Sequence, residues 1–180
     1  MSDTPTVLDS TRRFTGRVFN VRSDDVRFDD GSTHTIDIVE HRGAYAILAM
    51  PSEREVVLVR QYRHAVGRML WEIPAGTAES GEKPSTGAAR ELREETGYTA
   101  GSMRSLATFF TTPGFCTELM HLFLATELHA GPQELEEDER IAVASFTLEE
   151  ARTLVQSGEI ADAKTLVALL WITEKWPPLG

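Results

Sequence analysis

Three glutamates crowd one short segment of this chain. Glu91, Glu94 and Glu95 are three, four and one residues apart, so in a helix their carboxylates share about one turn. Like charges at this spacing repel one another and do not stabilise a helix. A hard divalent cation reverses that argument, because Mg²⁺ and Mn²⁺ take oxygen ligands and can also hold phosphate oxygens. The spacing therefore predicts metal-assisted chemistry; the alternative is a solvated acidic face paired with Arg90 and Arg93.

The residues around the glutamates predict a single helix over roughly 84 to 96. Pro84 has a fixed φ that suits the first helical turn, and Gly97 suits a left-handed cap at the other end. Ala88 and Leu92 lie four apart and form an apolar face that can pack on a core. Such a helix would turn the carboxylates away from its packed side.

The wider segment, residues 76–98, reads GTAESGEKPSTGAARELREETGY. This string resembles the Nudix box, in which glycine, glutamate and arginine recur at these spacings. Seven positions are fixed by residue type, so a chance match is on the order of 10⁻⁸ per starting position. The resemblance implies a Nudix fold, a mixed β-sheet between helices, and metal-assisted cleavage of a diphosphate. The expected class is α+β, as an α/β/α sandwich.

Roles at individual positions are implied by the same resemblance. Glu91 and Glu95 are expected to bind the metal with the Ala75 carbonyl, and Glu94 to bind it directly or through water, close to the chemistry. The expected cofactor is Mg²⁺, with Mn²⁺ as a substitute and two or three ions in the site. Four further residues of the box are expected to be structural: Gly76, Glu82, Arg90 and Gly97. In the family pattern Glu82 pairs with Arg90, and Arg90 is also within helical reach of Glu94.

An acidic run at residues 134–139 supplies candidates for a general base. Two cations about 3.5 to 4 Å apart can lower the pKa of a bound water, but a base must still take its proton. The run resembles the acidic loop that supplies the base in one branch of the family. This resemblance implies that Glu137 is the base and that Glu139 is a third carboxylate near the metals. The alternative is a solvated acidic loop.

The same branch, the ADP-ribose pyrophosphatases, is similar to this chain beyond the box. The resemblance lies in residues 59–63, 71–76 and 112–115, with Pro113 fifteen residues past Tyr98 as its marker. It implies hydrolysis of ADP-ribose to AMP and ribose 5-phosphate. Two alternatives stay open: hydrolysis of another nucleoside diphosphate sugar, such as GDP-mannose or a UDP-sugar, and a sensor that binds ADP-ribose without cleaving it.

Substrate contacts are expected from residues outside the box. Arg63, with Arg60 as the alternative, is expected to grip the diphosphate, because a guanidinium can hold two oxygens. In the resembling branch, strands before the main domain help to form the adenine pocket of a second subunit. Phe19 and Arg22 are therefore candidates there. The alternatives are that Phe19 is only part of the hairpin core and that Arg63 and Arg60 are surface charges. Pro113 and Glu118 are the remaining candidates for contact with the substrate.

Composition bounds the remaining possibilities. The chain has 180 residues with 41% hydrophobic content, enough for a full core. A net charge of −10 argues against nucleic-acid binding, and no stretch approaches the roughly 20 apolar residues that span a bilayer. The single cysteine, Cys116, suits a reducing compartment, and the first residues lack the apolar segment of a signal peptide. A cytoplasmic enzyme is expected.

Alternating apolar residues and turn signals predict how the chain is organised. Residues 1–39 are expected to form a loose tail and a β-hairpin, a dimerisation element that would make the protein a homodimer. Residues 40–180 are expected to form the Nudix domain. Its predicted strands lie at 44–50, 55–62, 70–73, 102–110, 119–125 and 141–146. Thr147 and Glu150 predict a capping box for a helix that ends near Gly158, and a last helix is expected at 163–175.

Overall fold

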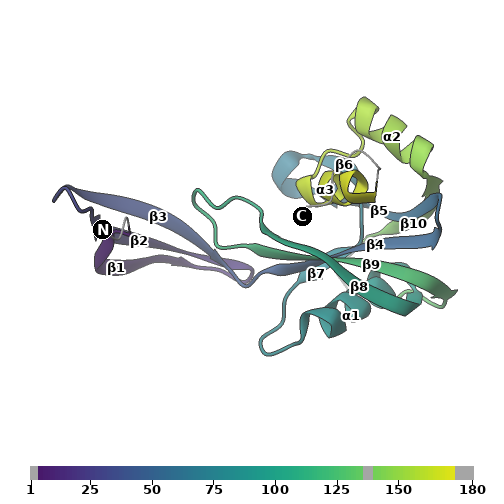
Figure 1. Cartoon of the computed structure of the whole chain (residues 1–180), viewed down its shortest axis with the longest axis horizontal. Coiled ribbons are helices and arrows are strands. Elements are labelled where there is room, and N and C mark those ends of the chain that lie inside the picture. Colours follow the sequence, from purple (N-terminus) through teal and green to yellow (C-terminus); the bar gives the residue numbers. More distant parts are fainter. Residues whose placement is uncertain (1–3, 136–139, 173–180) are drawn as a thin grey trace, which may run out of the picture. The chain divides into compact units, whose positions relative to one another are not determined.

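The computed structural model of the chain describes residues 4–135 and 140–172. The chain divides into two compact units (Figure 1). Unit 1 comprises Met1–Gly43 with Phe109–Leu119, and unit 2 comprises Ala44–Thr108 with Met120–Gly180. The segment that carries the glutamates belongs to unit 2.

Unit 1 is built on a three-stranded antiparallel sheet in the order β1-β2-β3. The strands are Thr6–Thr15, Phe19–Arg27 and Thr33–His41. The hairpin formed by β2 and β3 was predicted, but the prediction of a loose tail before it was wrong for the residues of β1. That strand pairs with β2 from Thr6 opposite Arg27 to Thr15 opposite Asn20, and the Ser10 hydroxyl donates to Asp24. Polar cross-strand contacts therefore hold a strand that has little apolar content.

Unit 2 contains a seven-stranded mixed sheet in the order β10-β5-β4-β9-β8, with β6 paired to β5 and β7 to β4. β4 and β9 run parallel, with Ala44 opposite Met120 and Ala49 opposite Ala125, while β5 is antiparallel to β4, β6 and β10. A short 3₁₀ helix, His64–Val66, joins β5 to β6. The seven strands are Ala44–Ser52 (β4), Glu55–Arg63 (β5), Arg68–Glu72 (β6), Ala75–Thr77 (β7), Tyr98–Phe110 (β8), Leu119–Ala130 (β9) and Ala142–Thr147 (β10).

Helices cover both faces of this sheet. Helix α1, Pro84–Thr96, lies on one face, and α2, Leu148–Ser157, and α3, Ala163–Ile172, lie on the other (Figure 1). The α+β class and the helix–sheet–helix layering predicted from the sequence are confirmed.

The predicted helix caps are present in unit 2. Gly97 ends α1 in the left-handed conformation with φ 74°. At the start of α2, the Glu150 amide donates to the Thr147 hydroxyl at 3.2 Å while the Thr147 amide donates to the Glu150 carboxylate at 2.8 Å. These helix ends are therefore made by contacts within a few residues of the chain.

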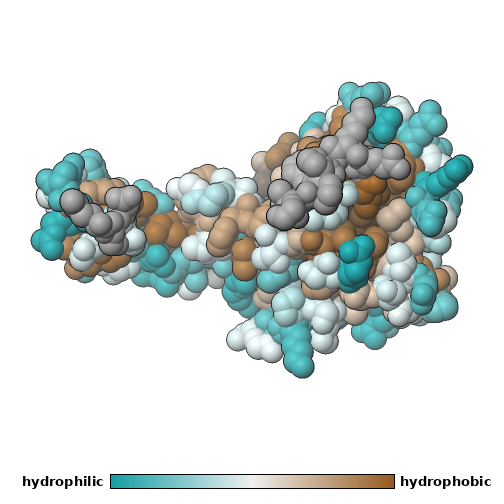
Figure 2. Space-filling model, viewed as in Figure 1, coloured by the Kyte–Doolittle hydropathy of each residue, from teal (hydrophilic) through white to brown (hydrophobic). Residues whose placement is uncertain are grey.

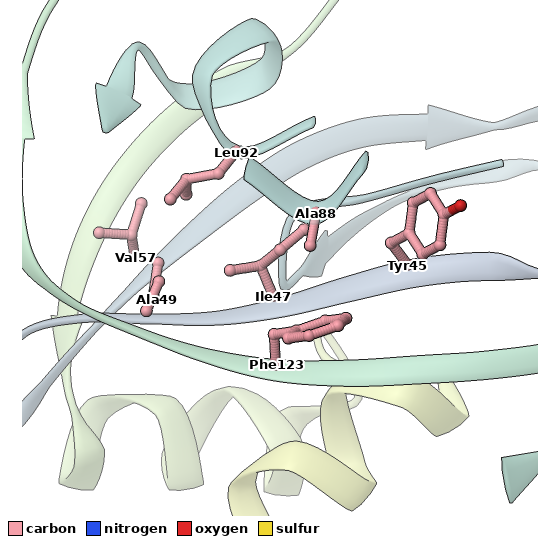
Figure 3. Packing of buried hydrophobic residues seen from close by; sticks show 8 residues of the cluster. Tyr45, Ile47, Ala49, Val57, Ala88, Leu92 and Phe123 are labelled. Carbon is pink, nitrogen blue, oxygen red and sulfur yellow. The ribbon is translucent and has the colours of Figure 1, made fainter. Parts of the chain in front are cut away.

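The α1 face of the sheet holds a packed core (Figure 3). Ala88 and Leu92 of α1, both fully buried, point at residues of β4, β5 and β9. The sheet residues of this cluster are Tyr45, Ile47, Ala49, Val57, Phe123 and Ala125. Because this apolar face is fixed on the sheet, the orientation of the remaining faces of α1 is fixed as well.

Candidate active site

Helix α1 places two of its glutamates at the edge of the core. Glu91 is 9% exposed and Glu95 is 4% exposed, whereas the side chain of Glu94 is 26% exposed. Burying ionised carboxylates is costly unless charge and hydrogen bonds compensate them. The helix therefore concentrates negative charge in a place where it needs a cation.

The strand before the helix fits closely against these carboxylates. A Cβ atom on Gly76 would lie 2.0 Å from Cδ of Glu91 and 2.1 Å from each of its oxygens. The Ala75 amide donates to Oε2 of Glu95 at 2.9 Å, and the Ile47 amide donates to the Pro74 carbonyl at 2.9 Å. The structure thus brings Ala75, Gly76, Glu91 and Glu95 together. Any side chain at position 76 would force the Glu91 carboxylate to move, a close fit that the sequence did not reveal.

Arg90 links the loop before α1 to the glutamates of the helix. Its Nε and Nη2 donate to the two carboxylate oxygens of Glu82, each at 3.1 Å. Its Nη1 lies 2.8 Å from Oε2 of Glu94 and 2.9 Å from Oε1 of Glu91. The pKa of Arg90 is raised, chiefly by the hydrogen bonds to Glu82 and further by the charges of Glu91 and Glu94. Both predicted pairings of Arg90, with Glu82 and with Glu94, are present.

The donor chemistry of this cluster suits a hard divalent cation. The candidate ligands are all oxygens, from Glu91, Glu94, Glu95 and the Ala75 carbonyl, and Mg²⁺ and Mn²⁺ prefer oxygen. One guanidinium faces several carboxylates, so the local charge stays negative. Within residues 4–135 and 140–172, however, no three His, Cys, Asp or Glu side chains already converge as a metal-binding group. Arg90 now spans Glu91 and Glu94, so these carboxylates would have to turn from it toward an ion.

The described start of the acidic run lies beside α1. The Gln133 side chain donates to the carbonyl of Glu95 at 2.6 Å, and the Glu134 amide donates to the carbonyl of Glu94 at 3.0 Å. Arg93 and Glu134 also form an ion pair at 3.3 Å. These contacts, which sequence reasoning did not foresee, attach the beginning of this segment to the helix that carries the glutamates. The predicted base Glu137 and the predicted ligand Glu139 lie outside the described residues.

Arg63 ends β5 with its guanidinium on Glu72. Nε donates to Oε1 at 2.8 Å and Nη2 to Oε2 at 2.7 Å, a two-pronged contact. These hydrogen bonds raise the pKa of Arg63 against the opposing effect of burial, and the charges of Glu95 and Asp162 raise it further. Arg63 therefore lies within electrostatic range of the buried Glu95 carboxylate. A contact between Arg63 and the diphosphate stays a prediction.

Arg60, the alternative to Arg63, has a different environment. Its Cζ lies 5.8 Å from the ring centroid of Trp71, its cross-strand neighbour on β6. This is a cation–π contact at an exposed site, typically worth about 0.5 to 1 kcal/mol. The contact gives Arg60 a structural role on the surface of the sheet.

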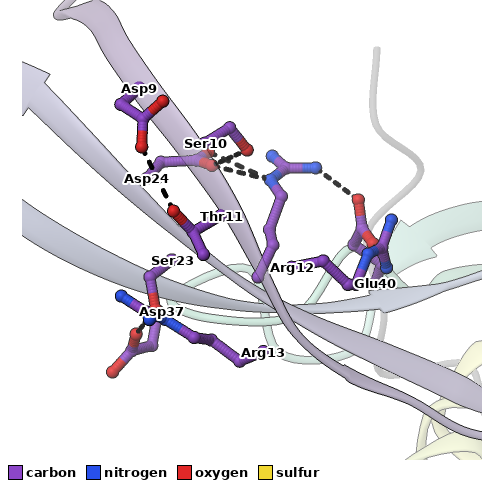
Figure 4. A network of polar contacts seen from close by, with 10 residues as sticks. Asp9, Ser10, Thr11, Arg12, Arg13, Ser23, Asp24, Asp37 and Glu40 are labelled. Carbon is purple, nitrogen blue, oxygen red and sulfur yellow. Dashed lines mark hydrogen bonds and ion pairs between the residues drawn. The ribbon is translucent and has the colours of Figure 1, made fainter.

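The remaining substrate candidates belong to unit 1. Phe19 is 43% exposed, and its ring centroid lies 5.9 Å from that of Phe14. Arg22 pairs with Asp24 at 3.0 Å and with Glu40 at 2.6 Å, in a network that ties β1, β2 and β3 together (Figure 4). Both residues thus have partners within their own sheet.

Glu118 and Pro113 lie in the segment of unit 1 contributed by Phe109–Leu119. Glu118 accepts from the Thr111 hydroxyl at 2.7 Å and lies 3.4 Å from Nδ1 of His41. The segment follows β3 through two backbone hydrogen bonds, from the Val39 amide to Phe115 and from the Thr117 amide to Val39. Both residues therefore lie in a loop held by β3.

Comparison with known proteins agrees with the fold and the box. The NUDIX domain family model matches residues 39–169. The chain is 43% identical to an ADP-ribose pyrophosphatase of Bacillus subtilis over 90% of this chain and 89% of that protein. It is 40% identical to a methanol dehydrogenase activator of Bacillus methanolicus over 88% of this chain and 87% of that protein. The chain belongs to the NUDIX family.

A solved structure described as an ADP compounds hydrolase superposes with a TM-score of 0.83. It covers 94% of this chain and 92% of its own, at 23% sequence identity. This likeness confirms the fold. Among the described residues, every helix is too short or too polar to cross a bilayer.

Proposed function

We propose that this protein hydrolyses ADP-ribose to AMP and ribose 5-phosphate in a Mg²⁺-dependent reaction. The observation that carries the proposal is the 43% identity with an ADP-ribose pyrophosphatase over nearly the whole chain. The two buried glutamates of α1 and the closely fitted strand before them support it, because they supply the carboxylates that a diphosphate-cleaving metal site needs.

Each residue of the site has a proposed task. Glu91, Glu95, Glu94, Glu139 and the Ala75 carbonyl would hold the cation, with Mn²⁺ as a substitute and two or three ions in all. Bound cations would lower the pKa of the attacking water and neutralise charge on the phosphate oxygens. Glu137 takes a proton from that water. The water oxygen forms a bond to one phosphorus atom while the bridging oxygen leaves with the other phosphate, so one water and one ADP-ribose give the two monophosphates.

Other residues hold the substrate and the frame of the site. Arg63 contacts the diphosphate through N–H donors outside its contact with Glu72. Arg90 and Glu82 keep the loop before α1 against the helix. Pro113 and Glu118 contribute to binding in the loop that follows β8. Each of these roles is a proposal that substitution and substrate kinetics can test.

We also propose that residues 1–39 form a dimerisation element of a cytoplasmic homodimer that binds neither nucleic acid nor membranes. Apolar side chains on β1 and β2 are exposed, including Val7 at 56%, Leu8 at 48% and Phe14 at 51%, and Figure 2 shows apolar surface in this unit. Such exposed apolar side chains favour association with a partner. Phe19 and Arg22 would then contribute to an adenine pocket of the second subunit. Light scattering of the purified chain measures whether it is dimeric.

A substrate panel with and without Mg²⁺ tests the catalytic proposal. ADP-ribose, GDP-mannose, UDP-glucose, NADH and diadenosine polyphosphates would be compared by kcat/KM. ADP-ribose is expected to give the highest value, with AMP released only when a divalent ion is present. A GDP-sugar or UDP-sugar preferred by tenfold or more would refute the substrate, and binding of ADP-ribose without release of AMP would identify a sensor.

A further inference from the structure

A group of four charged side chains joins the end of β6 to the start of α3. Glu72, the last residue of β6, is 1% exposed. Its carboxylate receives Arg63 through both oxygens and also pairs with the ammonium group of Lys164 through Oε2. Lys164 in turn lies 2.9 Å from Oδ2 of Asp162. Two positive and two negative side chains therefore balance within one network of unit 2.

The network keeps Glu72 ionised despite its burial. Burial alone would raise the pKa of Glu72, but the hydrogen bond from Arg63 and the charge of Lys164 outweigh it and lower the pKa. A buried carboxylate needs such partners, because removing one partner leaves a charge that is not compensated. Lys164 has a side chain that is only 13% exposed, so it too belongs to the interior.

The backbone around Glu72 is fixed from the same helix. Thr165 is fully buried, and its hydroxyl accepts from the Ile73 amide at 2.9 Å. The Thr165 amide donates to Asp162 at 3.1 Å, which caps the first turn of α3. Glu72 and the residue after it are therefore both attached to the start of α3, and Glu72 cannot shift without breaking these contacts.

The contact with Glu72 determines which side of the Arg63 guanidinium is available. A guanidinium has five N–H donors in one plane. The hydrogen bonds to Glu72 use one donor on Nε and one on Nη2, which leaves two donors on Nη1 and one on Nη2. The side chain of Arg63 is 39% exposed while that of Glu72 is 2% exposed. Arg63 thus extends from a buried acid toward solvent with donors that match phosphate oxygens.

We propose that Lys164 is a positioning residue for the diphosphate: it holds Glu72, and Glu72 holds Arg63 with its outer donors toward the substrate. This inference deepens the proposed function and rests on its assignment of Arg63 to the diphosphate. Lys164 touches no reacting atom and acts only through the other two residues. Its loss should therefore weaken substrate binding more than it slows the chemical step.

A double-mutant cycle on the full-length protein tests this relay. The four proteins are the wild type, Lys164→Gln, Arg63→Lys and the double variant. Glutamine keeps a donor for Glu72 without its charge, and lysine keeps a charge at position 63 but cannot form the two-pronged contact. Lys164→Gln should raise KM for ADP-ribose about tenfold, the equivalent of one charged hydrogen bond, with kcat within twofold. In the Arg63→Lys background the same change should raise KM less than twofold.

Controls separate positioning from a general loss of structure. Lys164→Arg keeps the charge that Lys164→Gln removes, so its KM should lie close to the wild-type value. Arg152, exposed on α2, provides a matched change of one surface charge, and Arg152→Gln should alter neither KM nor kcat. Equal effects of Lys164→Gln in both backgrounds, or a fall in kcat with KM unchanged, would overturn the inference.

Binding of α,β-methylene-ADP, a diphosphate that is not hydrolysed, gives a second readout by calorimetry in the presence of Mg²⁺. Its dissociation constant should follow the KM pattern across the four proteins. A wild-type chain that binds this probe but leaves ADP-ribose intact would refute the proposed function. The double-mutant cycle could then still be measured from the dissociation constants of the probe. A wild-type chain that does not bind it would refute the positioning role.

Discussion

Replacing Gly76 with alanine would push a methyl group into the carboxylate of Glu91. The added Cβ would lie 2.0 to 2.1 Å from all three carboxylate atoms, against 3.4 Å for ordinary contact. The φ of Gly76 is outside the left-handed region, so the backbone itself tolerates alanine. Any cost of the substitution therefore comes from the collision with Glu91.

The collision sets the size of the effect. Restoring ordinary contact requires a movement of 3.4 minus 2.0, or 1.4 Å, and Oε1 of Glu91 lies only 2.9 Å from Arg90 Nη1. A shift of that size breaks this ion pair and moves a candidate metal ligand. We expect the free energy of unfolding to fall by about 1 to 3 kcal/mol, as in other overpacked sites. Mn²⁺ affinity and turnover should fall about 100-fold, since residues that only support a metal ligand already cost 10- to 100-fold.

Titration with Mn²⁺, followed by electron paramagnetic resonance, measures affinity directly, and thermal unfolding measures stability. The control is Gly114→Ala, whose Cβ would meet no atom within 4 Å; it should keep both metal affinity and Tm. A second comparison places Gly76→Ala in a Glu91→Ala background, where the methyl group meets no carboxylate and should cost little stability. The reasoning fails if Gly76→Ala binds Mn²⁺ like the wild type, or if its stability cost is the same in both backgrounds.

Four further substitutions test the carboxylates. Glu95→Gln should lower metal affinity and turnover by about 10² without loss of folding, because an amide oxygen can still accept from Ala75; near-native activity at limiting Mg²⁺ would exclude Glu95 as a ligand. Glu137→Gln should lower kcat and remove the acidic limb of the pH–rate profile while KM and metal affinity change little. Glu139→Gln should instead shift the dependence of the rate on Mg²⁺ concentration. Full kcat in Glu137→Gln would place the base elsewhere. The folded-state pKa of Glu72 is lowered below its ordinary value of 4.5, so the ion pair of Glu72 stabilises the fold above pH 4.5 and loses this effect as pH falls through the lowered value. The Tm difference between the wild type and Glu72→Gln should therefore shrink on acidification. A Tm difference that persists through that range would contradict the ion-pair account.

The sequence alone determined the features that depend on neighbours within a few residues. Proline and glycine fixed the ends of α1, Thr147 and Glu150 fixed the start of α2, and the four-residue spacing placed Glu91 and Glu95 on one side of a helix. These signals act within one or two turns, so they are visible in a linear string. The same spacing made the metal hypothesis possible before the fold was known.

Contacts between distant segments decided the rest. Strand β1 was missed because its sequence shows no alternation of apolar and polar residues. It forms a strand because it pairs with β2. The close contact between Gly76 and Glu91 arises only because β7 lies against the side of α1.

The pair formed by Glu72 and Lys164 joins residues 92 positions apart. The strength of this ion pair depends on burial, because burial lowers the local dielectric and leaves each charge in need of a partner. A sequence specifies which side chains carry charge, but only the packed structure determines which of them lose water and must therefore meet.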